Sequence, residues 1–483
     1  MAFAITQTCC ADASCVSVCP VNCIHPTPDE PDFGTTDMLY VNPATCIDCG
    51  ACADACPVDA IFPAGDLTGS LKVYEEINAE FYAGRDVLAE ATVAPNFHRW
   101  SPPSFARILP SDFAPLDVAV VGTGPAGMYA VEDLLLHTTS RVTLIDRLDT
   151  AGGLIRYGVA PDHPSTKKIG ETFARFHDHP RLRLRLGTEA GPELAERYDA
   201  VIYAVGATEA RRLDVPGEDL PGSLPAATVV NWYNGHPGVR PDAVDLSAER
   251  VVVVGTGNVA LDIARILTAD PESLADTSIA PATLARLRSS KVREVVLLAR
   301  RGPSDAAYTR SELLALAARG DLVVDAHDPR VAAAIDAGDG KAALLQGVPR
   351  ETVDWSSPPS DGTRRVVLRF HSAPLEFTGD TEVRGVRVTG DVEITAGRVV
   401  RAAGFRGAPV PGLPFDEVTG TVPNTAGRVL PGTYVAGWIK RGPSGGIGAN
   451  KACARETVGA LLEDAVAGRL RTRGQRRRSA ARR

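Results

Sequence analysis

With 483 residues, of which 44% are hydrophobic and 23% charged, the chain has the composition of a soluble globular protein of about three domains. Apolar runs fall short of the ~20 residues that cross a bilayer, and the N-terminus lacks the basic and apolar segments of a secretory signal, so we expect a cytoplasmic protein without membrane contact. The net charge of −8 is unevenly spread, since residues 1–66 hold nine acids and no Lys or Arg, whereas residues 469–483 hold eight arginines and no acid.

These two ends favour different roles. The acidic head is either a docking face for a basic surface or an ordinary solvated face. The arginine-rich tail, residues 469–483, is predicted to be disordered, because such charge runs are usually solvated tails.

Nine of the ten cysteines lie before residue 57. In a chain without a secretory signal, clustered cysteines indicate metal binding or redox chemistry. Cys46, Cys49, Cys52 and Cys56-Pro have the bacterial ferredoxin spacing, in which three thiolates hold one iron–sulfur cluster and the fourth ligates a second. A zinc site is the alternative for Cys-x-x-Cys pairs.

The same pattern recurs 37 residues earlier, as Cys9, Asp12, Cys15 and Cys19-Pro. Two half-sites in tandem resemble the two-cluster bacterial ferredoxins, and predict an α+β domain over residues 1–65 in which each half donates its last cysteine to the other half. One 4Fe–4S cluster is expected on Cys46, Cys49, Cys52 and Cys19, and the other cluster on Cys9, Cys15 and Cys56.

Asp12 departs from the pattern, because it stands where the second half has Cys49. A carboxylate is a weak ligand to a fourth iron, or the position stays open, so the resemblance implies a 3Fe–4S or a labile 4Fe–4S cluster here. Cys10 is an alternative ligand that lies one residue out of register. Cys23 and Cys453 are expected to be core residues.

Residues 66–114 are predicted to form a linker with a helix from Tyr74 to Leu88, followed by proline breaks. A buried strand, 117–121, then leads into the loop Gly122-Thr-Gly124-Pro-Ala-Gly127, and the next strand, 141–145, ends at Asp146. This is the strand–turn–helix that binds the pyrophosphate of a dinucleotide, with the acid on the ribose. The first part of an FAD domain is therefore expected over residues 115–214.

A second fingerprint follows strand 251–254, as Gly255-Thr-Gly257-Asn-Val-Ala260. The next strand, 294–298, ends in Arg300 and Arg301, and guanidinium groups there suit the 2′-phosphate of NADP. We expect an NADP domain over residues 215–395. Strands near Val399–Gly404 and Gly432–Gly437 are predicted to return to the first domain, so that residues 396–468 complete it. The predicted fold is an α/β flavoprotein in which the NADP domain is inserted into a Rossmann-like FAD domain.

Four segments carry a family resemblance: Gly152-Gly-Leu-Ile-Arg-Tyr-Gly-Val-Ala-Pro-Asp162-His163, Gly257-Asn-Val-Ala-Leu-Asp262, Arg300-Arg-Gly-Pro and Gly437-Trp-Ile-Lys-Arg-Gly-Pro-Ser-Gly445. They resemble the adrenodoxin reductase family of ferredoxin–NADP reductases, over nearly the whole chain, with a ferredoxin fused at the N-terminus. The usual apolar residue after Gly445 is replaced by Gly446.

The resemblance implies three sets of site residues. FAD would contact Gly122, Gly124, Ala126, Asp146, Leu154, Val205, Trp438, Gly445, Gly446 and Ile447. NADP would contact Gly257, Asn258, Val259, Arg300, Arg301, Glu312 and Gly445. His163 and Asp262 would organise water and protons beside the flavin, although the residues alone indicate only a turn and a helix surface.

The implied reaction is hydride transfer from NADPH to FAD and then one-electron transfer to iron–sulfur clusters, in the fused ferredoxin or in an external one. The small subunit of glutamate synthase is a second hypothesis, against which the Asp162-His163 and Trp-Ile-Lys-Arg-Gly-Pro motifs speak. A non-catalytic redox sensor that binds a partner or nucleic acid is a third hypothesis, and only the arginine tail supports it.

Overall fold

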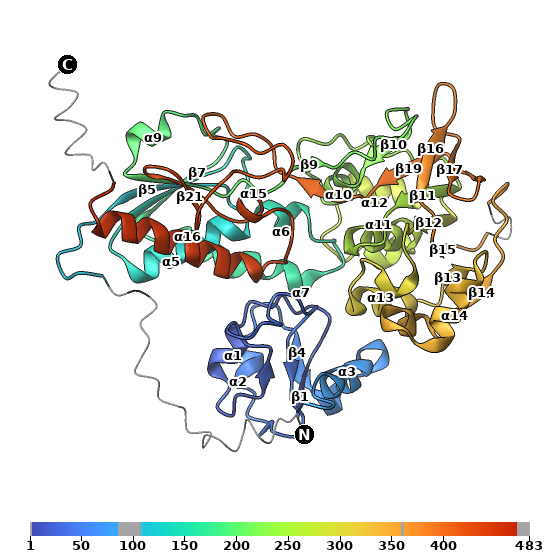
Figure 1. Cartoon of the computed structure of the whole chain (residues 1–483), viewed down its shortest axis with the longest axis horizontal. Helices are drawn as coiled ribbons and strands as arrows, with labels where there is room; N and C mark the ends of the chain where they lie inside the picture. Colours follow the sequence, from blue (N-terminus) through green and yellow to red (C-terminus); the bar gives the residue numbers. More distant parts are fainter. Residues whose placement is uncertain (1, 86–106, 108, 359–361, 471–483) are drawn as a thin grey trace. The chain divides into compact units, whose positions relative to one another are not determined.

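The computed structural model describes residues 2–85, 107, 109–358 and 362–470 (Figure 1). The chain divides into two compact units. Unit 1 comprises Met1–Arg156, Ser165–Glu209 and Phe405–Arg483, and unit 2 comprises Tyr157–Pro164 and Ala210–Gly404. The chain therefore enters and leaves unit 2 twice.

The N-terminal part of unit 1 is built from two similar halves. The first half contains β1 (Phe3–Ile5), α1 (Ser14–Val18) and β2 (Ile24–His25), and the second half contains β3 (Tyr40–Val41), α2 (Ala51–Ala55) and β4 (Ile61–Pro63). Strand β1 pairs antiparallel with β4, and β2 pairs antiparallel with β3. Each half thus completes a sheet with the other half.

The 37-residue repeat is also visible in the backbone. Left-handed conformations occur at Ala11 (φ 50°) and Ala13 (φ 60°), and again at Asp48 (φ 60°) and Gly50 (φ 75°), which lie 37 positions later. Backbone in this region is unfavourable for residues other than glycine, so its recurrence shows that both cysteine loops follow the same path. This agrees with the predicted tandem ferredoxin halves.

The predicted helix Tyr74–Leu88 is shorter in the structure and belongs to the N-terminal part. Two 3₁₀ turns, Ala64–Asp66 and Gly69–Leu71, precede α3 (Val73–Phe81). The buried Asn78 side chain accepts from the Ile5 and Val41 amides (3.1 and 2.8 Å), so α3 is tied to β1 and β3 rather than serving as a linker. The rest of the predicted linker, 86–106 and 108, lies outside the described residues.

The larger part of unit 1 is a six-stranded sheet in the order β21-β22-β8-β5-β6-β7. The strands are β5 (Asp117–Val121), β6 (Arg141–Ile145), β7 (Leu182–Arg185), β8 (Ala200–Tyr203), β21 (Arg428–Leu430) and β22 (Thr433–Val435). All except β21 are parallel. Helices along this part of the chain are α5 (Pro125–His137), α6 (Gly153–Tyr157), α7 (Pro164–Lys167), α8 (Ile169–Ala174), α9 (Leu194–Arg197), α15 (Trp438–Arg441) and α16 (Ala449–Val466). Helices α5 and α16 lie side by side (Figure 1).

Unit 2 is built on a seven-stranded parallel sheet in the order β10-β19-β11-β12-β15-β13-β14. The strands are β10 (Ser223–Pro225), β11 (Arg250–Val254), β12 (Glu294–Leu298), β13 (Leu322–Asp325), β14 (Arg350–Glu351), β15 (Arg365–Arg369) and β19 (Arg398–Arg401). A three-stranded antiparallel sheet contains β16 (Pro374–Thr378), β17 (Gly385–Val388) and β18 (Val392–Thr395). A separate short pair is formed by β9 (Glu209–Ala210) and β20 (Phe405–Arg406).

Alternate residues of the parallel strands in unit 2 enter two separate cores. Val251 and Val253 pack with the helices α10 (Ala226–Tyr233), α11 (Asn258–Thr268), α12 (Pro281–Arg288), α13 (Arg310–Ala317) and α14 (Pro329–Ala337). Val252 and Val254 pack with the antiparallel β16–β18 sheet. Both faces of the central sheet are therefore covered, as the continuous apolar runs in its strands require. Three 3₁₀ turns complete the unit, at Pro271–Leu274, Pro303–Asp305 and Gly340–Leu345.

One predicted strand was assigned to the wrong sheet. The strand at Val399–Val400 lies between β10 and β11 in unit 2, whereas the strand near Gly432–Gly437 does join the sheet of unit 1 as β22. The crossing back into unit 1 lies after Gly404, not at residue 396. A short apolar run identifies a buried strand but carries no information about which of two parallel sheets receives it.

Within the described part of the chain, no helix combines the length and the apolar character needed to span a bilayer. The ordered chain extends into the predicted tail, because Arg469 pairs with Asp464 (2.6 Å) and Leu470 is buried. The remainder of that tail, 471–483, lies outside the described residues.

Two truncations should therefore behave differently. Removing residues 471–483 should leave the melting temperature and the flavin content unchanged. Removing residues 469–483 should lower the free energy of unfolding by about 1–3 kcal/mol, since a buried leucine and an ion pair are lost with it. Thermal unfolding of both truncated proteins, monitored by flavin fluorescence, measures the difference in stability. Equal stability of the two truncated chains would contradict the prediction.

Candidate functional site

The thiols of the N-terminal part form two groups. Burial raises the pKa of Cys9 to about 11, with smaller contributions from the neighbouring Cys56 and Asp12. Burial likewise raises the pKa of Cys15, again with contributions from Cys9 and Cys56. Cys56, which belongs to the second half of the repeat, therefore lies with the thiols of the first half.

The second group contains thiols of the second half of the repeat together with Cys19 of the first half. Burial raises the pKa of Cys52 to about 11, with contributions from Cys46, Cys19 and Cys49. A hydrogen bond with the Cys23 thiol lowers the pKa of Cys19 to about 6, and the two sulfur atoms are 3.4 Å apart. The first group also contains Cys10, and the second also contains Cys23. The crossed ligand sets predicted from the sequence lie within these two groups, and soft sulfur donors suit iron–sulfur clusters.

The backbone also bonds to the crossing cysteines in the same way in both halves. The Cys23 amide donates to Cys19 Sγ (3.4 Å), and the Ala60 amide, 37 positions later, donates to Cys56 Sγ (3.2 Å). Hydrogen bonds to sulfur stabilise the thiolate form that binds iron. Cys23 and Cys453 are both buried, as expected for core residues.

Asp12 takes the position of Cys49 but is engaged elsewhere. One of its carboxylate oxygens accepts from the Ser14 amide (3.3 Å), and the other accepts from the Ser14 hydroxyl and lies 3.7 Å from Lys451 Nζ. The backbone nearby is held too, since the Gly448 amide donates to the Cys10 carbonyl (2.9 Å). The loop that contains Asp12 thus contacts the start of α16, next to the predicted flavin loop.

The three glycines of the first loop have different surroundings. A Cβ at Gly122 (φ 105°) would lie 2.4 Å from the Ala204 carbonyl oxygen, and a Cβ at Gly127 would lie 1.9 Å from the Gly122 carbonyl oxygen. A Cβ at Gly124 would meet no atom within 4 Å. The outer glycines therefore allow strand, turn and helix to pack closely, and the open space before Gly124 fits a pyrophosphate at the N-terminus of α5.

Other predicted FAD residues gather around this loop. A Cβ at Gly153 would lie 2.8 Å from the Gly124 Cα, so the next residue, Leu154, lies close to the loop. Val205 directly follows Ala204, whose carbonyl oxygen is close to Gly122. A Cβ at Gly437 would lie 2.6 Å from the Cβ of Ala126, which places the following Trp438 there as well.

The flanks of this cradle are held by polar contacts. The Trp438 indole donates to the Gly445 carbonyl (3.2 Å). Gly446 precedes Ile447 and α16 in the chain, and a Cβ at Gly446 would meet no atom within 4 Å. Asp146 accepts from the Thr123 amide (2.9 Å), so its carboxylate joins the end of β6 to the glycine loop.

The second glycine loop, in unit 2, repeats this arrangement. A Cβ at Gly255 (φ 126°) would lie 2.5 Å from the Ala402 carbonyl oxygen, whereas a Cβ at Gly257 would meet no atom within 4 Å. Ala260 is completely buried, consistent with a close helix–strand contact at the third position. Asn258, at the start of α11 with Val259, accepts from the Thr309 amide (2.9 Å). This loop is a second dinucleotide cradle.

Arg300 and Arg301 follow β12 at the same carboxyl edge of the sheet, and both are exposed. The backbone of their turn is fixed by neighbouring strands, because the Ser372 amide donates to the Ala299 carbonyl (2.8 Å) and the His371 amide to the Arg301 carbonyl (3.2 Å). Exposed guanidinium groups on a fixed turn are available to an anionic ligand.

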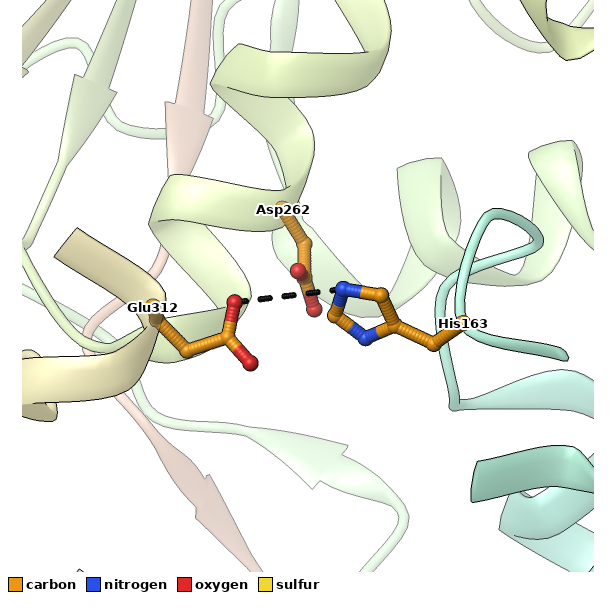
Figure 2. Close-up of side chains that lie close together, drawn as sticks. All are labelled: His163, Asp262 and Glu312. Carbon is orange, nitrogen blue, oxygen red and sulfur yellow. Dashed lines mark ion pairs between the residues drawn. The ribbon is translucent and has the colours of Figure 1, made fainter. Parts of the chain in front are cut away.

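His163, Asp262 and Glu312 converge within unit 2 (Figure 2). His163 Nε2 lies 4.0 Å from Glu312 Oε2, and ligand atoms of all three side chains lie within 4.8 Å of one another. Asp262 is in the second turn of α11 and Glu312 in the first turn of α13, so two helices and the segment 157–164 supply one group each.

This cluster is suited to hold protons. Burial raises the pKa of Asp262, an effect that the nearby Arg265 and His163 oppose. Burial also raises the pKa of Glu312, and the charge of Asp262 raises it further. Groups with raised pKa beside a histidine can store and pass protons at neutral pH. A metal ion fits poorly, because the Arg265 guanidinium already donates to Asp262 (2.5 Å) and to His163 (3.2 Å).

Sequence reasoning missed Arg265 and Lys451. Arg265 lies one turn after Asp262 on α11, so an arginine at i+3 from a predicted site acid is a signal that the sequence offered. Lys451 is 439 positions from Asp12 in the sequence, so no local pattern reveals their contact.

Comparisons with known proteins agree with this arrangement. Residues 116–302 match the pyridine nucleotide-disulphide oxidoreductase family, and residues 39–62 match the 4Fe-4S binding domain family. A probable ferredoxin/ferredoxin–NADP reductase of Mycobacterium tuberculosis is 45% identical over 97% of this chain and 85% of its own length. Human mitochondrial NADPH:adrenodoxin oxidoreductase is 36% identical over 77% of this chain and 83% of its own length. The structure of Mycobacterium tuberculosis FprA in complex with NADPH has a TM-score of 0.67 and 40% identity, covering 76% of this chain and 89% of that one.

Proposed function

This chain belongs to the ferredoxin–NADP reductase family, in the form that carries its own ferredoxin domain, and we propose that it transfers electrons from NADPH through FAD to iron–sulfur clusters. The predicted fold class, an iron–sulfur domain followed by a two-dinucleotide flavoprotein, is confirmed by the matches to both component families.

One observation carries the proposal: a single chain combines two glycine cradles with two crossed groups of thiols. Gly124 and Gly257 each face open space at the start of a helix, where a pyrophosphate would be held. Cys56 and Cys19 each lie with the thiols of the opposite half. This combination needs a reaction that joins a two-electron donor to one-electron acceptors.

A bound flavin would supply that conversion, because it accepts a hydride and releases electrons singly. The chain's own residues bind and orient the participants. Arg300 and Arg301 would hold the 2′-phosphate of NADPH, and the His163–Asp262–Glu312 cluster would hold protons at the reacting end. No side chain has to form a covalent bond with the substrate.

Two contacts support electron transfer to the N-terminal domain. Within unit 1 it contacts the flavin part through the Asp59–Lys168 ion pair and the hydrogen bond from Gly448 to Cys10. We assign a 4Fe–4S cluster to Cys19, Cys46, Cys49 and Cys52, and a second cluster to Cys9, Cys15 and Cys56. An external ferredoxin could then take electrons from these clusters.

Stopped-flow spectroscopy tests the proposal. After mixing with NADPH, flavin bleaching should precede bleaching of the iron–sulfur absorbance, and both rates should be independent of protein concentration, because a tether gives a high effective concentration. A cluster-reduction rate that rises linearly with protein concentration would show transfer between molecules. Absence of flavin bleaching by NADPH would refute the proposed function itself.

A further inference from the structure

We propose that Arg265 is a positioning residue that fixes which nitrogen of His163 carries the proton. The inference rests on the proposed function only for its kinetic consequence. The assignment of the proton itself follows from contacts within unit 2 and can be tested without any turnover.

The Arg265 side chain is 10% exposed and contacts two members of the cluster, together with the neighbouring Asp162. Its guanidinium donates to Asp262 Oδ1 (2.5 Å), approaches His163 Nε2 (3.2 Å) and pairs with Asp162 Oδ2 (3.1 Å). It therefore connects the segment 157–164 to α11 at the point where His163 enters the site.

The direction of the His163 contact follows from the chemistry of the two groups. A guanidinium has donors only and keeps its charge in proteins. His163 Nε2 must therefore be the acceptor, and it cannot carry a proton itself. The imidazole is then neutral and its proton resides on Nδ1, which is the nitrogen left to donate.

Glu312 is the competing partner for the same nitrogen, because its Oε2 lies 4.0 Å from His163 Nε2. The groups facing His163 are Asp162, Asp262, Glu312 and Arg265, with the buried Tyr233 close to Asp262. Three carboxylates share one guanidinium. Without Arg265 they would draw a proton to Nε2, so this arginine decides the tautomer.

An arginine that merely joins two segments would also be buried and bonded, and Arg319 provides a matched control. Arg319 Nη1 donates to the backbone carbonyl of Arg265 (2.8 Å), and Nη2 pairs with Asp321 (2.7 Å). Arg319→Gln removes a half-buried arginine that donates to the backbone of α11, and it leaves the His163 contact in place. Arg265→Gln removes the contact, and Arg265→Lys keeps the positive charge.

The direct experiment is nitrogen NMR of the full-length holoprotein with labelled histidine, with the His163 signals identified from their loss in His163→Gln. In the wild-type protein Nδ1 should be the protonated nitrogen and Nε2 the bare acceptor. A proton on Nε2 in the wild-type protein would overturn the inference, whatever the variants do. In Arg265→Gln the proton should move to Nε2, while Arg319→Gln should keep the wild-type pattern.

The kinetic experiment follows flavin reduction by NADPH in the same proteins. Arg265→Gln should slow it about 10- to 100-fold, the scale of a misplaced reacting group. Because Arg265 opposes the raised pKa of Asp262, its loss should move the acid limb of the pH profile to higher pH. Arg265→Lys should restore part of the rate, and binding of 2′,5′-ADP should be unchanged in all variants. A wild-type rate and pH profile in Arg265→Gln would overturn the inference, whereas a wild-type protein that NADPH does not reduce would refute the proposed function.

Discussion

Replacing Arg300 and Arg301 together with alanine should raise the KM for NADPH about a hundredfold or more and leave the KM for NADH nearly unchanged. Both side chains are exposed on a turn that neighbouring strands hold by backbone hydrogen bonds. Each charge-assisted contact to a phosphate is worth about 1.5–3 kcal/mol, and about 1.4 kcal/mol corresponds to a tenfold change in affinity. NADH lacks the 2′-phosphate, so it loses no such contact.

Steady-state reduction of ferricyanide by the two nucleotides measures this selectivity, and calorimetric titration with 2′,5′-ADP measures binding alone. Arg293→Ala is the matched control, because Arg293 immediately precedes β12 at the opposite edge of the same sheet. A similar rise in KM for both nucleotides would show that the two arginines support the fold of the turn and do not recognise the phosphate.

The sequence was sufficient where short-range chemistry decides the structure. Strands 117–121, 141–145 and 294–298 were predicted to the residue, because glycine loops and apolar runs mark their ends. The 37-residue repeat predicted the two ferredoxin halves, and the structure shows it in paired left-handed residues. These features depend on residues that are close in sequence.

Features that depend on distant contacts could not be predicted in this way. Asn78 binds β1 and β3, so α3 belongs to the N-terminal domain, and β19 joins the sheet of unit 2. The pairing of His163 with Asp262 came only from the family resemblance, which implied Glu312 as an NADP contact. The convergence of all three side chains, which lie on separate segments, needed the structure. The contacts of Arg265 and Lys451 needed the structure itself.

The second large effect concerns the cluster at Asp12, which we expect to be a 3Fe–4S centre after aerobic purification. In the proposed ligand set Cys9, Cys15 and Cys56 would supply three thiolates, but the fourth position of the repeat holds a carboxylate. A carboxylate is a harder donor than a thiolate and suits iron–sulfur clusters less well. The Asp12 oxygens are also already committed to Ser14 and to Lys451, so binding a fourth iron must displace these contacts.

The hydroxyl of Ser14 is itself informative. The equivalent position in the second half of the repeat is Ala51, and the residue equivalent to Asp12 there is Cys49. The half of the repeat that has a carboxylate in place of the cysteine therefore also has a nearby hydroxyl. The Ser14 hydroxyl donates a hydrogen bond to the Asp12 carboxylate. This pairing holds Asp12 in place at the start of α1 and reduces its availability as an iron ligand.

Low-temperature EPR of the oxidised protein, combined with iron analysis, distinguishes the possibilities. An oxidised 3Fe–4S centre is paramagnetic and an oxidised 4Fe–4S centre is silent, so the wild-type protein should give a signal and bind about seven irons. Asp12→Cys should abolish that signal and raise the content to about eight irons, because it restores the fourth thiolate. Cys10→Ser is the matched control and should keep the signal. The opposite result would be a silent spectrum in the wild-type protein and a signal in Cys10→Ser. It would show that Cys10, one residue out of register, is the fourth ligand, and that Asp12 serves only to dock its loop against Lys451.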